Sequence, residues 1–513
     1  MLLKIINLIK TNIFHFIKTP SLIKKLLFYR VYFGKNKNTK KVILFDNFEV
    51  VDHIEKRVFI LKQLQNISNA NFYYFGKIRS LLIYIIYKCL GANYLKFKLS
   101  KEEINKLNKI HDKFLKKIKS KKDVINLKIY GINFGTDLYE SYLRNYSKAT
   151  LDIKDQKFVT LLKQSLILIF FWKNFFLKYR VKSVLISHRN FINTNIVCKF
   201  AYKYKVPVYT LNGSGNRLSR FIDDRLDECK YYSHYFNKLS KKEKRIGINL
   251  SKKQLNKRFK GMVGVNMKYS TKSAFKRNIT RKQIVTDANK TNVLICTHCF
   301  YDNPHAYGGN LFLDFYEWIS FLGKLSYETK YNWYIKPHPD YLPGTIEIIN
   351  QLMIKFKSIK LVDPDCSFHQ LKNEGLDYVL TTYGSVAHEL PLLDINVINA
   401  DKYNPNCSFR YSKTPKNLKD YKKILLSLGK RKLNNTKFKS DIYKFYYIHY
   451  YFMQGKKLFE EDNESSFLKL DYFQSKSKIR NKLEGKLVKY FLNNKKYSLE
   501  NYKMAIIKNY EKS

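Results

Sequence analysis

The sequence predicts an α/β protein with two Rossmann-like, doubly wound lobes. The chain has 513 residues, more than a single hydrophobic core usually serves, and this length indicates about two to four domains. Apolar residues make up 45% and aromatic residues 16%, which is enough to fill real cores. Two separate series of short apolar strand patterns alternate with helical patterns, and this alternation is typical of parallel sheets covered by helices.

The first series of elements defines the N-terminal lobe. Strand, helix and strand at this spacing form a βαβ unit, which requires a parallel sheet. The expected elements are strand 41–45 (KVILF), helix 53–65, strand 71–75, a charged solvent-facing helix 101–122, strand 182–188 (KSVLISH), helix 194–204 and strand 207–211 (PVYTL).

The second series defines the C-terminal lobe. Its expected elements are strand 292–297, helix 313–327, strand 332–336, helix 345–356, strand 360–362, strand 377–381, helix 385–393 and strand 396–398. Between the two series, residues 238–281 are strongly basic and lack clear periodicity, so we interpret them as the link between the lobes. The stretch after about residue 430 is basic and aromatic with a helical pattern.

These patterns predict five segments. They are an amphipathic basic helix and linker (1–38), an N-terminal Rossmann-like lobe (39–240), a basic inter-lobe segment (241–290), a C-terminal Rossmann-like lobe (291–430) and a helical C-terminal extension (431–513).

The charge balance is strongly basic. Lys and Arg number 96 against 41 Asp and Glu, a formal net charge of +55. Such an excess points to an anionic partner, but here it is mostly lysine and spreads over every segment, so a general compositional bias explains it as well. Because neither an arginine-rich cluster nor an RNP1 motif is present, we do not expect a nucleic-acid partner.

The N-terminal residues form an amphipathic pattern. Wound as a helix, they place Leu2, Ile5, Ile6, Ile9, Ile13, Phe16 and Ile17 on one face and Lys4, Asn7, Thr11, His15 and Lys18 on the other. Two readings stay open: a helix lying on an anionic leaflet, or a helix docked on the protein's own core. No apolar run approaches the 18 residues that span a bilayer, and the best, 166–172, stops at Lys173.

The seven cysteines are odd in number and irregularly spaced, which favours a reducing compartment. The one tight group is Cys296-Thr-His-Cys299, with His305 nearby, but no second cysteine pair completes a four-ligand site. We therefore expect no metal site.

The segment NWYIKPHPDYLPG, residues 332–344, holds three of the ten prolines of the chain. Each proline keeps its preceding residue extended, so Lys336 and His338 are fixed as the strand runs out. Alternation along the strand puts both on one side. A lysine is a point charge for phosphate, and a histidine can donate to a phosphate oxygen or protonate a leaving group. The alternative is a proline-closed turn with an exposed lysine.

A second motif, TTYGSVAHE at 381–389, reads as strand, glycine turn and helix start. Thr382, Gly384 and Ser385 fall in the turn. Ser385 is expected to cap the helix, so that the N–H groups of residues 386–388 form a phosphate cradle. Glu389, one turn further along, would accept hydrogen bonds from a ribose diol. The plainer alternative is a glutamate that only complements the helix dipole.

Candidate acid–base residues lie in both lobes. Asp302 and His305, in the stretch DNPH after the first strand of the second lobe, form an acid–base pair or an acceptor-sugar site, or else an Asx turn before a proline. His188 ends KSVLISH in the first lobe and is a candidate base, facing the same cleft if the lobes oppose each other. Its alternative is a structural strand-end histidine.

The order IKPHPD, then LVDPDCSF, then DYVLTTYGSVAHELPLLDINVINA resembles the nucleotide-sugar-binding lobe of GT-B glycosyltransferases. It looks closest to bacterial capsule and surface-polysaccharide proteins related to polysialyl and Kdo transferases. CTHCFYDNPHAYGGNLFLDFYEWISFL is similar to the start of that lobe. The likeness covers about residues 290–430, and the first lobe only by architecture. The small residue and Gly-Pro expected after the glutamate are replaced by LPLLDINV, which alters the expected nucleotide pocket.

The resemblance implies a two-lobed fold, no metal in the chemistry, and His338 with Ser385 near the phosphate of a CMP- or UDP-linked sugar donor. The expected function is transfer of that sugar to a glycan or lipid-linked acceptor of a growing bacterial surface polysaccharide. The expected location is cytoplasmic, peripheral on the inner face of the plasma membrane. Two rivals stay open: a glycerophosphotransferase of the teichoic-acid kind, and a non-catalytic polysaccharide-export or nucleic-acid-binding protein.

Overall fold

The computed structural model describes residues 39–47, 51–78, 81–211, 217–221, 226–264, 272–276, 283–287, 289–429, 438–453 and 456–457. The chain forms two compact units. Unit 1 comprises Met1–His111, Lys163–Asp224 and Gln454–Ser513, and unit 2 comprises Asp112–Leu162 and Arg225–Met453. The amphipathic segment 1–38 and most of the extension 431–513 lie outside the described residues.

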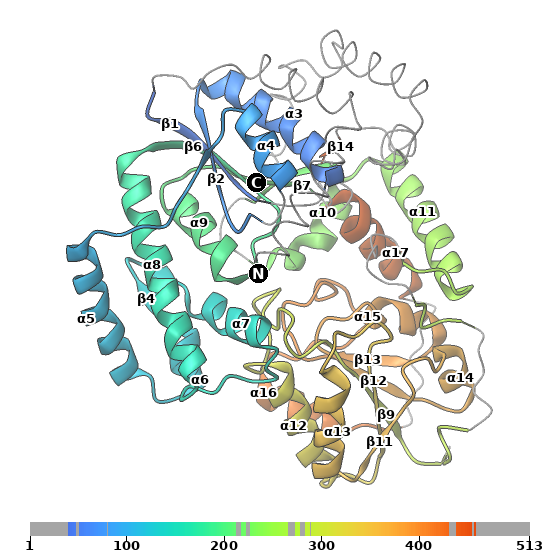
Figure 1. Cartoon of the computed structure of the whole chain (residues 1–513). Coiled ribbons are helices and arrows are strands. Elements are labelled where there is room, and N and C mark those ends of the chain that lie inside the picture. The colour runs from blue at the N-terminus through green and yellow to red at the C-terminus, as the bar shows by residue number, and fades with distance from the viewer. Residues whose placement is uncertain are drawn as a thin grey trace. The chain divides into compact units, whose positions relative to one another are not determined.

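Unit 1 is built on one twisted sheet with the order β14-β8-β7-β6-β1-β2-β3 among the described residues (Figure 1). Its strands are β1 (Lys41–Asp46), β2 (Asn71–Phe75), β3 (Asn93–Tyr94), β6 (Arg180–Ile186), β7 (Val208–Leu211), β8 (Arg217–Phe221) and β14 (Lys456–Lys457). Strands β3, β2, β1, β6 and β7 are parallel, β8 pairs antiparallel with β7 at one edge, and β14 pairs antiparallel with β8. In chain order the parallel part reads 3-2-1-4-5, the doubly wound arrangement.

Helices cover both faces of this sheet. The helices are α3 (Val51–Ser68), α4 (Leu81–Cys89), α8 (Gln156–Lys178) and α9 (Phe191–Lys203), while α5 (Lys101–Lys117) contacts α8 through Glu103 and Asn174. On one face Phe45 packs edge-on against Tyr87 of α4 at 5.1 Å between ring centroids. On the other, Phe75 packs against Trp172 of α8 at 5.0 Å. Burial on both faces explains why β1 reads as a continuous apolar run.

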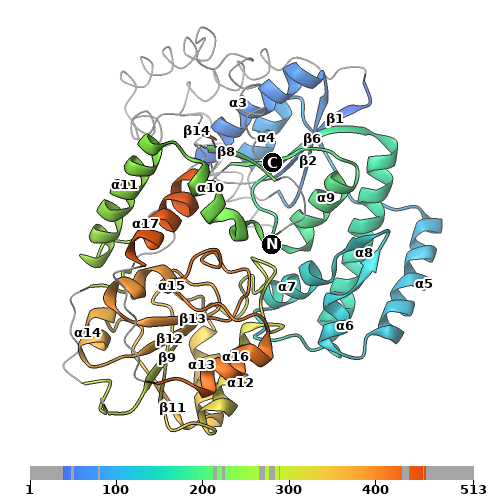
Figure 2. The same ribbon diagram turned by 180° about the vertical axis from the view of Figure 1, so that it is seen from behind.

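Unit 2 contains a second parallel sheet, with the order β11-β10-β9-β12-β13 (Figure 2). Its strands are β9 (Asn292–Cys296), β10 (Asn332–Lys336), β11 (Ile359–Leu361), β12 (Tyr378–Thr381) and β13 (Asn396–Asn399). Its helices are α12 (Phe315–Ser326), α13 (Thr345–Lys355), α14 (Phe368–Asn373), α15 (Val386–Glu389), η2 (Leu390–Leu393) and α16 (Leu418–Leu426). The chain order is again 3-2-1-4-5, so the prediction of two Rossmann-like lobes is confirmed.

The expectation of a linker without periodicity at 238–281 is wrong for the first part of that stretch. Following η1 (Glu228–Tyr231) and α10 (Tyr232–Lys238), helix α11 (Lys241–Phe259) runs for 19 residues and begins with a capping box between Ser240 and Glu243. Its buried face is Gly247, Ser251, Leu255 and Arg258, so small and charged residues replace the apolar repeat that a periodicity search detects.

Helix α11 packs on the end of the described chain. The C-terminal partners are α17 (Lys439–Tyr447) and the π-helical turn η4 (Ile448–Phe452), which share an aromatic core with α10. A Cβ at Gly247 would lie 2.5 Å from the Tyr447 ring, so the glycine permits this close approach. The helical pattern predicted after residue 430 is thus present in the part of that stretch that the structure describes.

Residues 112–162 pack with unit 2, whereas the expected boundaries put them in the first lobe. This segment holds α6 (Lys121–Ile125), the hairpin β4 (Lys128–Ile129) and β5 (Ile132–Asn133), and α7 (Gly135–Tyr146). The Tyr139 hydroxyl donates to Asp314 Oδ2 at 2.5 Å, and Thr150 donates to the same oxygen at 2.6 Å. These buried polar contacts join segments more than 160 residues apart, and no local pattern encodes them.

Helix α8 is longer than the apolar run seen in the sequence. Among the described residues it is the one helix long and apolar enough to cross a membrane by length and composition, with a mean hydropathy of 1.2 over its most apolar window. More than half of that window, 56%, is buried inside the protein. The fully buried residues Phe158, Leu162, Leu166 and Ile169 recur at helical spacing, the pattern of a core helix.

Candidate functional site

The site in unit 2 lies where the strand order reverses. Strands β9 and β12 are neighbours in the sheet, and the chain leaves them toward opposite sides. In such sheets ligands bind beyond the carboxyl ends of the strands at this switch point. The loops that follow Cys296 and Thr381 meet there, since His298 Nε2 lies 3.1 Å from Thr381 Oγ1.

The glycine turn after β12 is held by the same threonine. The Gly384 N–H donates to Thr381 Oγ1 at 3.1 Å, so this hydroxyl joins the turn to His298. A Cβ at Gly384 would lie 2.8 Å from Thr381 Oγ1 and 3.6 Å from His298 Cε1, which leaves little room for a side chain. Thr382 is fully buried, and its hydroxyl makes no hydrogen bond within the described residues.

Ser385 does not cap the helix as expected. Its hydroxyl donates to Glu389 Oε2 at 3.1 Å, and its backbone is already helical, with φ −59° and ψ −24°. The amides of Ala387 and His388 donate to Gly384 O and Ser385 O, so two of the three N–H groups assigned to the cradle close the turn instead. In the described part of the chain, the N–H groups of Ser385 and Val386 carry no hydrogen bond.

Glu389 is buried in an ion pair. Its Oε1 lies 2.8 Å from Arg258 Nε, and both side chains are at most 8% exposed. Arg258 also donates to the Met262 carbonyl at 3.2 Å and to Ser273 Oγ at 3.3 Å. A ribose would have to bind a carboxylate that already has a cationic partner. The ribose role of Glu389 stays a prediction.

Lys336 does not project into solvent beside His338. It is 3% exposed, its ammonium donates to the Pro364 carbonyl, and it lies 5.7 Å from the centroid of the Phe368 ring. Desolvation lowers the pKa of Lys336. Lys336 is thus a buried charge at the end of β10 and not an exposed contact. It influences the site electrostatically.

The two imidazoles of the site are close enough to interact. His338 is exposed at the surface, and its Nδ1 lies 3.1 Å from the Asp340 N, which leaves Nε2 for a ligand. Desolvation by the surrounding protein lowers the pKa of His338, and the charges of Lys336 and Arg258 add to the effect. Burial, together with the neighbouring His338, lowers the pKa of His298 to about 3. Both rings are therefore neutral at pH 7 in a positive environment, which favours an anion.

The expected pairing of Asp302 with His305 is not formed. His305 Nδ1 lies 3.2 Å from Glu140 Oε1, and its backbone N–H donates to the same oxygen at 2.8 Å. Desolvation raises the pKa of Glu140, while its bonds to His305 oppose that rise. Asp302 is exposed, and its N–H closes a turn onto Cys299 O. His305 therefore contacts the buried carboxylate of Glu140 on α7 and not Asp302.

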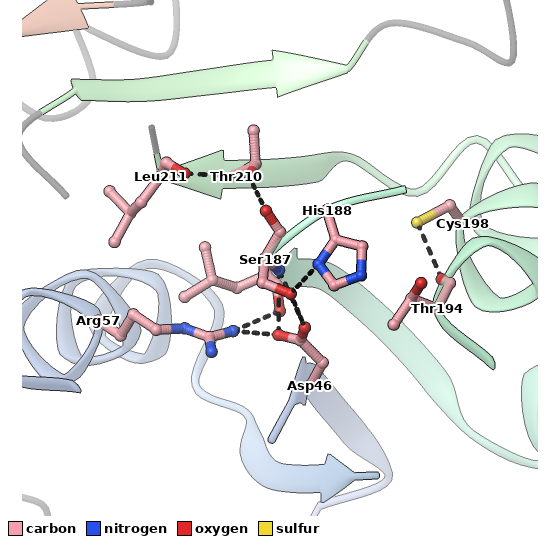
Figure 3. Close-up of polar contacts among 9 residues, drawn as sticks. Asp46, Arg57, Ser187, His188, Thr194, Cys198, Thr210 and Leu211 are labelled. Atoms are coloured by element: carbon pink, nitrogen blue, oxygen red, sulfur yellow. Dashed lines mark hydrogen bonds and ion pairs between the residues drawn. The ribbon is translucent and has the colours of Figure 1, made fainter. Parts of the chain in front are cut away.

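His188 belongs to unit 1. It follows β6, its side chain is exposed, and its Nδ1 lies 2.7 Å from Ser187 Oγ (Figure 3). The structure therefore gives two separate groups of candidate residues, one at the switch point of each sheet. His338, Thr382, Gly384, Ser385 and Glu389 gather in unit 2, with Lys336 buried behind them.

Sequence reasoning considered His298 only as part of a possible metal group, and it missed Arg258. His298 follows a strand that the sequence did predict, so the rule that ligands gather at strand ends could have selected it. Arg258 gave no such signal, because its helix was taken for a linker and its partner lies 131 residues away. In the described part of the chain, no three His, Cys, Asp or Glu side chains are grouped closely enough to hold a metal ion.

No protein-family model and no curated protein matches the chain. Solved structures with some similarity include a glycosyltransferase from Rickettsia africae, with 11% identity, coverage of 89% of this chain and 100% of that one, and a TM-score of 0.25. S. aureus MnaA with UDP has 13% identity, coverage of 89% of this chain and 97% of that one, and a TM-score of 0.22. Anabaena HepE with UDP and glucose has 10% identity, coverage of 81% of this chain and 95% of that one, and a TM-score of 0.24. Such low identities and TM-scores say nothing about function, and the fold rests on the strand orders themselves.

Proposed function

We propose that the protein is a GT-B glycosyltransferase that moves a sugar from a CMP- or UDP-linked donor to a bacterial surface glycan. One observation carries the proposal. At the switch point of the unit 2 sheet, two neutral imidazoles, His298 and His338, gather with the Thr381–Ser385 turn near the buried Lys336. This chemistry suits a phosphate group.

Each part of the site has a role in this proposal. His338 Nε2 donates a hydrogen bond to an oxygen of the donor phosphate and stabilises the negative charge that develops on the departing nucleotide. The free amides of Ser385 and Val386 bind a second phosphate oxygen. The buried charge of Lys336 favours the added negative charge without touching it.

The first experiment is a thermal-shift screen of the full chain with CMP, UDP, GDP and CDP-glycerol. A nucleotide at 100 times its Kd stabilises the protein by about 2.7 kcal/mol. For a domain of this size, that corresponds to a rise in Tm of about 5–10 °C. We expect His338→Ala to reduce this rise, and His234→Ala, an exposed histidine on α10 of the same unit, to keep it.

The second experiment supplies nucleotide-sugars or CDP-glycerol with a label on the group to be transferred. It measures transfer of that label to lipid-linked or polysaccharide acceptors. Transfer from CDP-glycerol alone would replace the proposal by a glycerophosphotransferase. No response to any nucleotide, with binding to nucleic acid instead, would leave the non-catalytic rival in place.

We also propose that the protein works on the inner face of a bacterial plasma membrane, where its net charge of +55 meets anionic lipid. Co-flotation of the full chain with vesicles tests this. Binding to vesicles with phosphatidylglycerol, lost at high salt and absent with phosphatidylcholine alone, is the expected result. Equal binding to both vesicles would contradict an electrostatic attachment.

A further inference from the structure

Helix α11 of unit 2 presents a basic face to solvent. The helix lies beside α17 (Figure 1 and Figure 2), and its opposite face is buried against the protein. Apart from Glu243, its exposed positions fall within an arc of about 140°, since each residue turns a helix by about 100°. The exposed basic residues of this arc are Lys241, Lys242, Arg245, Lys252 and Lys253, and the exposed Lys260 follows at the C-cap.

The protein does not neutralise the charges of this face. Among the described residues, none of these basic side chains forms an ion pair, and Lys252 contacts only the Tyr443 ring, at 5.6 Å from its centroid. Glu243 is the only acid of the helix, and its carboxylate accepts from the Ser240 N–H at 3.0 Å in the capping box. Like charges one turn apart repel, so an anionic partner would relieve a repulsion that the fold leaves in place.

Helix α5 shows that a lysine-rich helix of this chain need not have such a face. Its exposed lysines include Lys106, Lys109 and Lys113. Two exposed acids, Glu102 and Asp112, lie among them on the same side of the helix. The face of α11 therefore differs in its lack of acidic residues, which a general excess of lysine does not explain.

The residue types of the α11 face favour a lipid surface over a nucleic acid. Lysine predominates, and its ammonium is a point charge that suits headgroup phosphates. The face carries no aromatic side chain on which a base could stack. Ile246 is 50% exposed at the edge of the arc, next to Lys242 and Lys253, where it can enter the headgroup layer. Clusters of about four to eight basic residues on such a helix are typical of binding to anionic lipid.

We propose that the exposed face of α11 docks on the anionic lipids of a membrane. This rests on the proposed location at a bacterial plasma membrane and names the surface that makes the contact. The basic side chains bind headgroup phosphates, and Ile246 lies between the headgroups. On the opposite face of the helix, Arg258 pairs with Glu389 of the candidate site at 2.8 Å. The site thus lies one helix diameter, about 10 Å, from the membrane surface, within reach of a lipid-linked acceptor.

The first test neutralises the face in the full chain. Lys242→Gln, Arg245→Gln and Lys253→Gln are combined, because glutamine at these exposed positions keeps the helix propensity. Binding is measured by co-flotation with vesicles of equal parts phosphatidylglycerol and phosphatidylcholine. We expect the α11 variant to bind about 100-fold more weakly than the wild type, since each basic residue at the membrane surface contributes about fivefold.

The matched control removes the same number of charges from α5. It combines Lys106→Gln, Lys109→Gln and Lys113→Gln, which are exposed as well. Salt screens charges outside the contact, so we expect this variant to bind less than about fivefold more weakly. Equal Tm values of the two variants and the wild type show that the substitutions leave the fold intact.

A second readout reports the contact itself. The three native tryptophans, Trp172, Trp318 and Trp333, are fully buried, so a tryptophan added at the surface can be read separately. We expect the emission of Ile246→Trp to shift to shorter wavelength when the anionic vesicles are added, because the ring enters the interface. Ile104→Trp on α5, where the isoleucine is 43% exposed, should show no shift.

The outcomes separate this inference from the proposed location. Equal losses in the two triple variants, or vesicle binding without a shift in Ile246→Trp, would overturn docking through α11 and leave the membrane location in place. No vesicle binding by the wild type would refute the location and the inference together. Binding of duplex DNA that the α11 variant loses, without binding to vesicles, would assign the face to a nucleic acid and overturn the proposal.

Discussion

Removal of one partner of the buried Arg258–Glu389 pair is predicted to destabilise unit 2 strongly. The two side chains meet at 2.8 Å and are 8% and 3% exposed, so neither charge can turn to solvent. Loss of one member of such a pair costs about 3–5 kcal/mol, because the other stays buried without its partner. Replacement of both by apolar residues of similar volume is often neutral or stabilising.

The experiment is a double-mutant cycle of Arg258→Met, Glu389→Leu and both together. Urea unfolding followed by tryptophan fluorescence is suitable, because two of the three tryptophans, Trp318 and Trp333, are fully buried in unit 2. We expect each single variant to lose about 3–5 kcal/mol and the double variant to lose less than either. Single losses below about 1 kcal/mol, or a double loss equal to the sum, would refute the buried-pair argument.

The same double variant decides what Glu389 does. If Glu389 holds a nucleotide ribose, as the sequence suggests, the folded double variant loses the thermal stabilisation by nucleotide. If Glu389 serves only to pair with Arg258, that stabilisation remains. The wild type and the His234→Ala control give the reference shift for both outcomes.

Two further predictions concern packing and pH. Gly247→Ala puts a Cβ 2.5 Å from the Tyr447 ring and should lower the free energy of unfolding in urea by about 1–3 kcal/mol. Gly429→Ala, with nothing within 4 Å of the added Cβ, should leave that free energy unchanged. Equal losses in the two variants would contradict the close helix packing. Burial raises the pKa of Asp401 to about 7, so its ionisation weakens the folded state as pH rises from about 4 to 7. We expect Asp401→Asn to flatten the fall in Tm over that range without stabilising the protein at pH 4, and a parallel shift at all pH values would refute the titration.

Local patterns predicted most of the parallel sheets. Strands 71–75 and 332–336 lie at the expected residues, and β6 begins two residues earlier than expected. Strands buried on both faces are short apolar runs, so the sequence carries their signal directly. The helix at 385–393 is present as α15 followed by the 3₁₀ turn η2, because Pro391 interrupts regular α-helical bonding.

The candidate site was predicted only in outline. The prolines around His338 and the glycine at 384 pointed to the correct strand ends, because strand ends and turns have local signatures. The contacts between site residues have no local signature in the sequence. His298 contacts Thr381, 83 residues further along, and Ser385 binds Glu389 where a helix cap was expected. A side chain with several possible acceptors takes the one that packing brings nearest.

The sequence by itself determined the class of the protein, because apolar periodicity and turn residues are read within a few neighbouring positions. Tertiary structure alone decided the pairing of charges. Asp46 meets Ser187 across 141 residues and Arg258 meets Glu389 across 131, in each case because a buried charge must find a partner wherever the fold provides one. The same need explains why α11, whose buried face is small and charged, forms a helix that periodicity did not reveal.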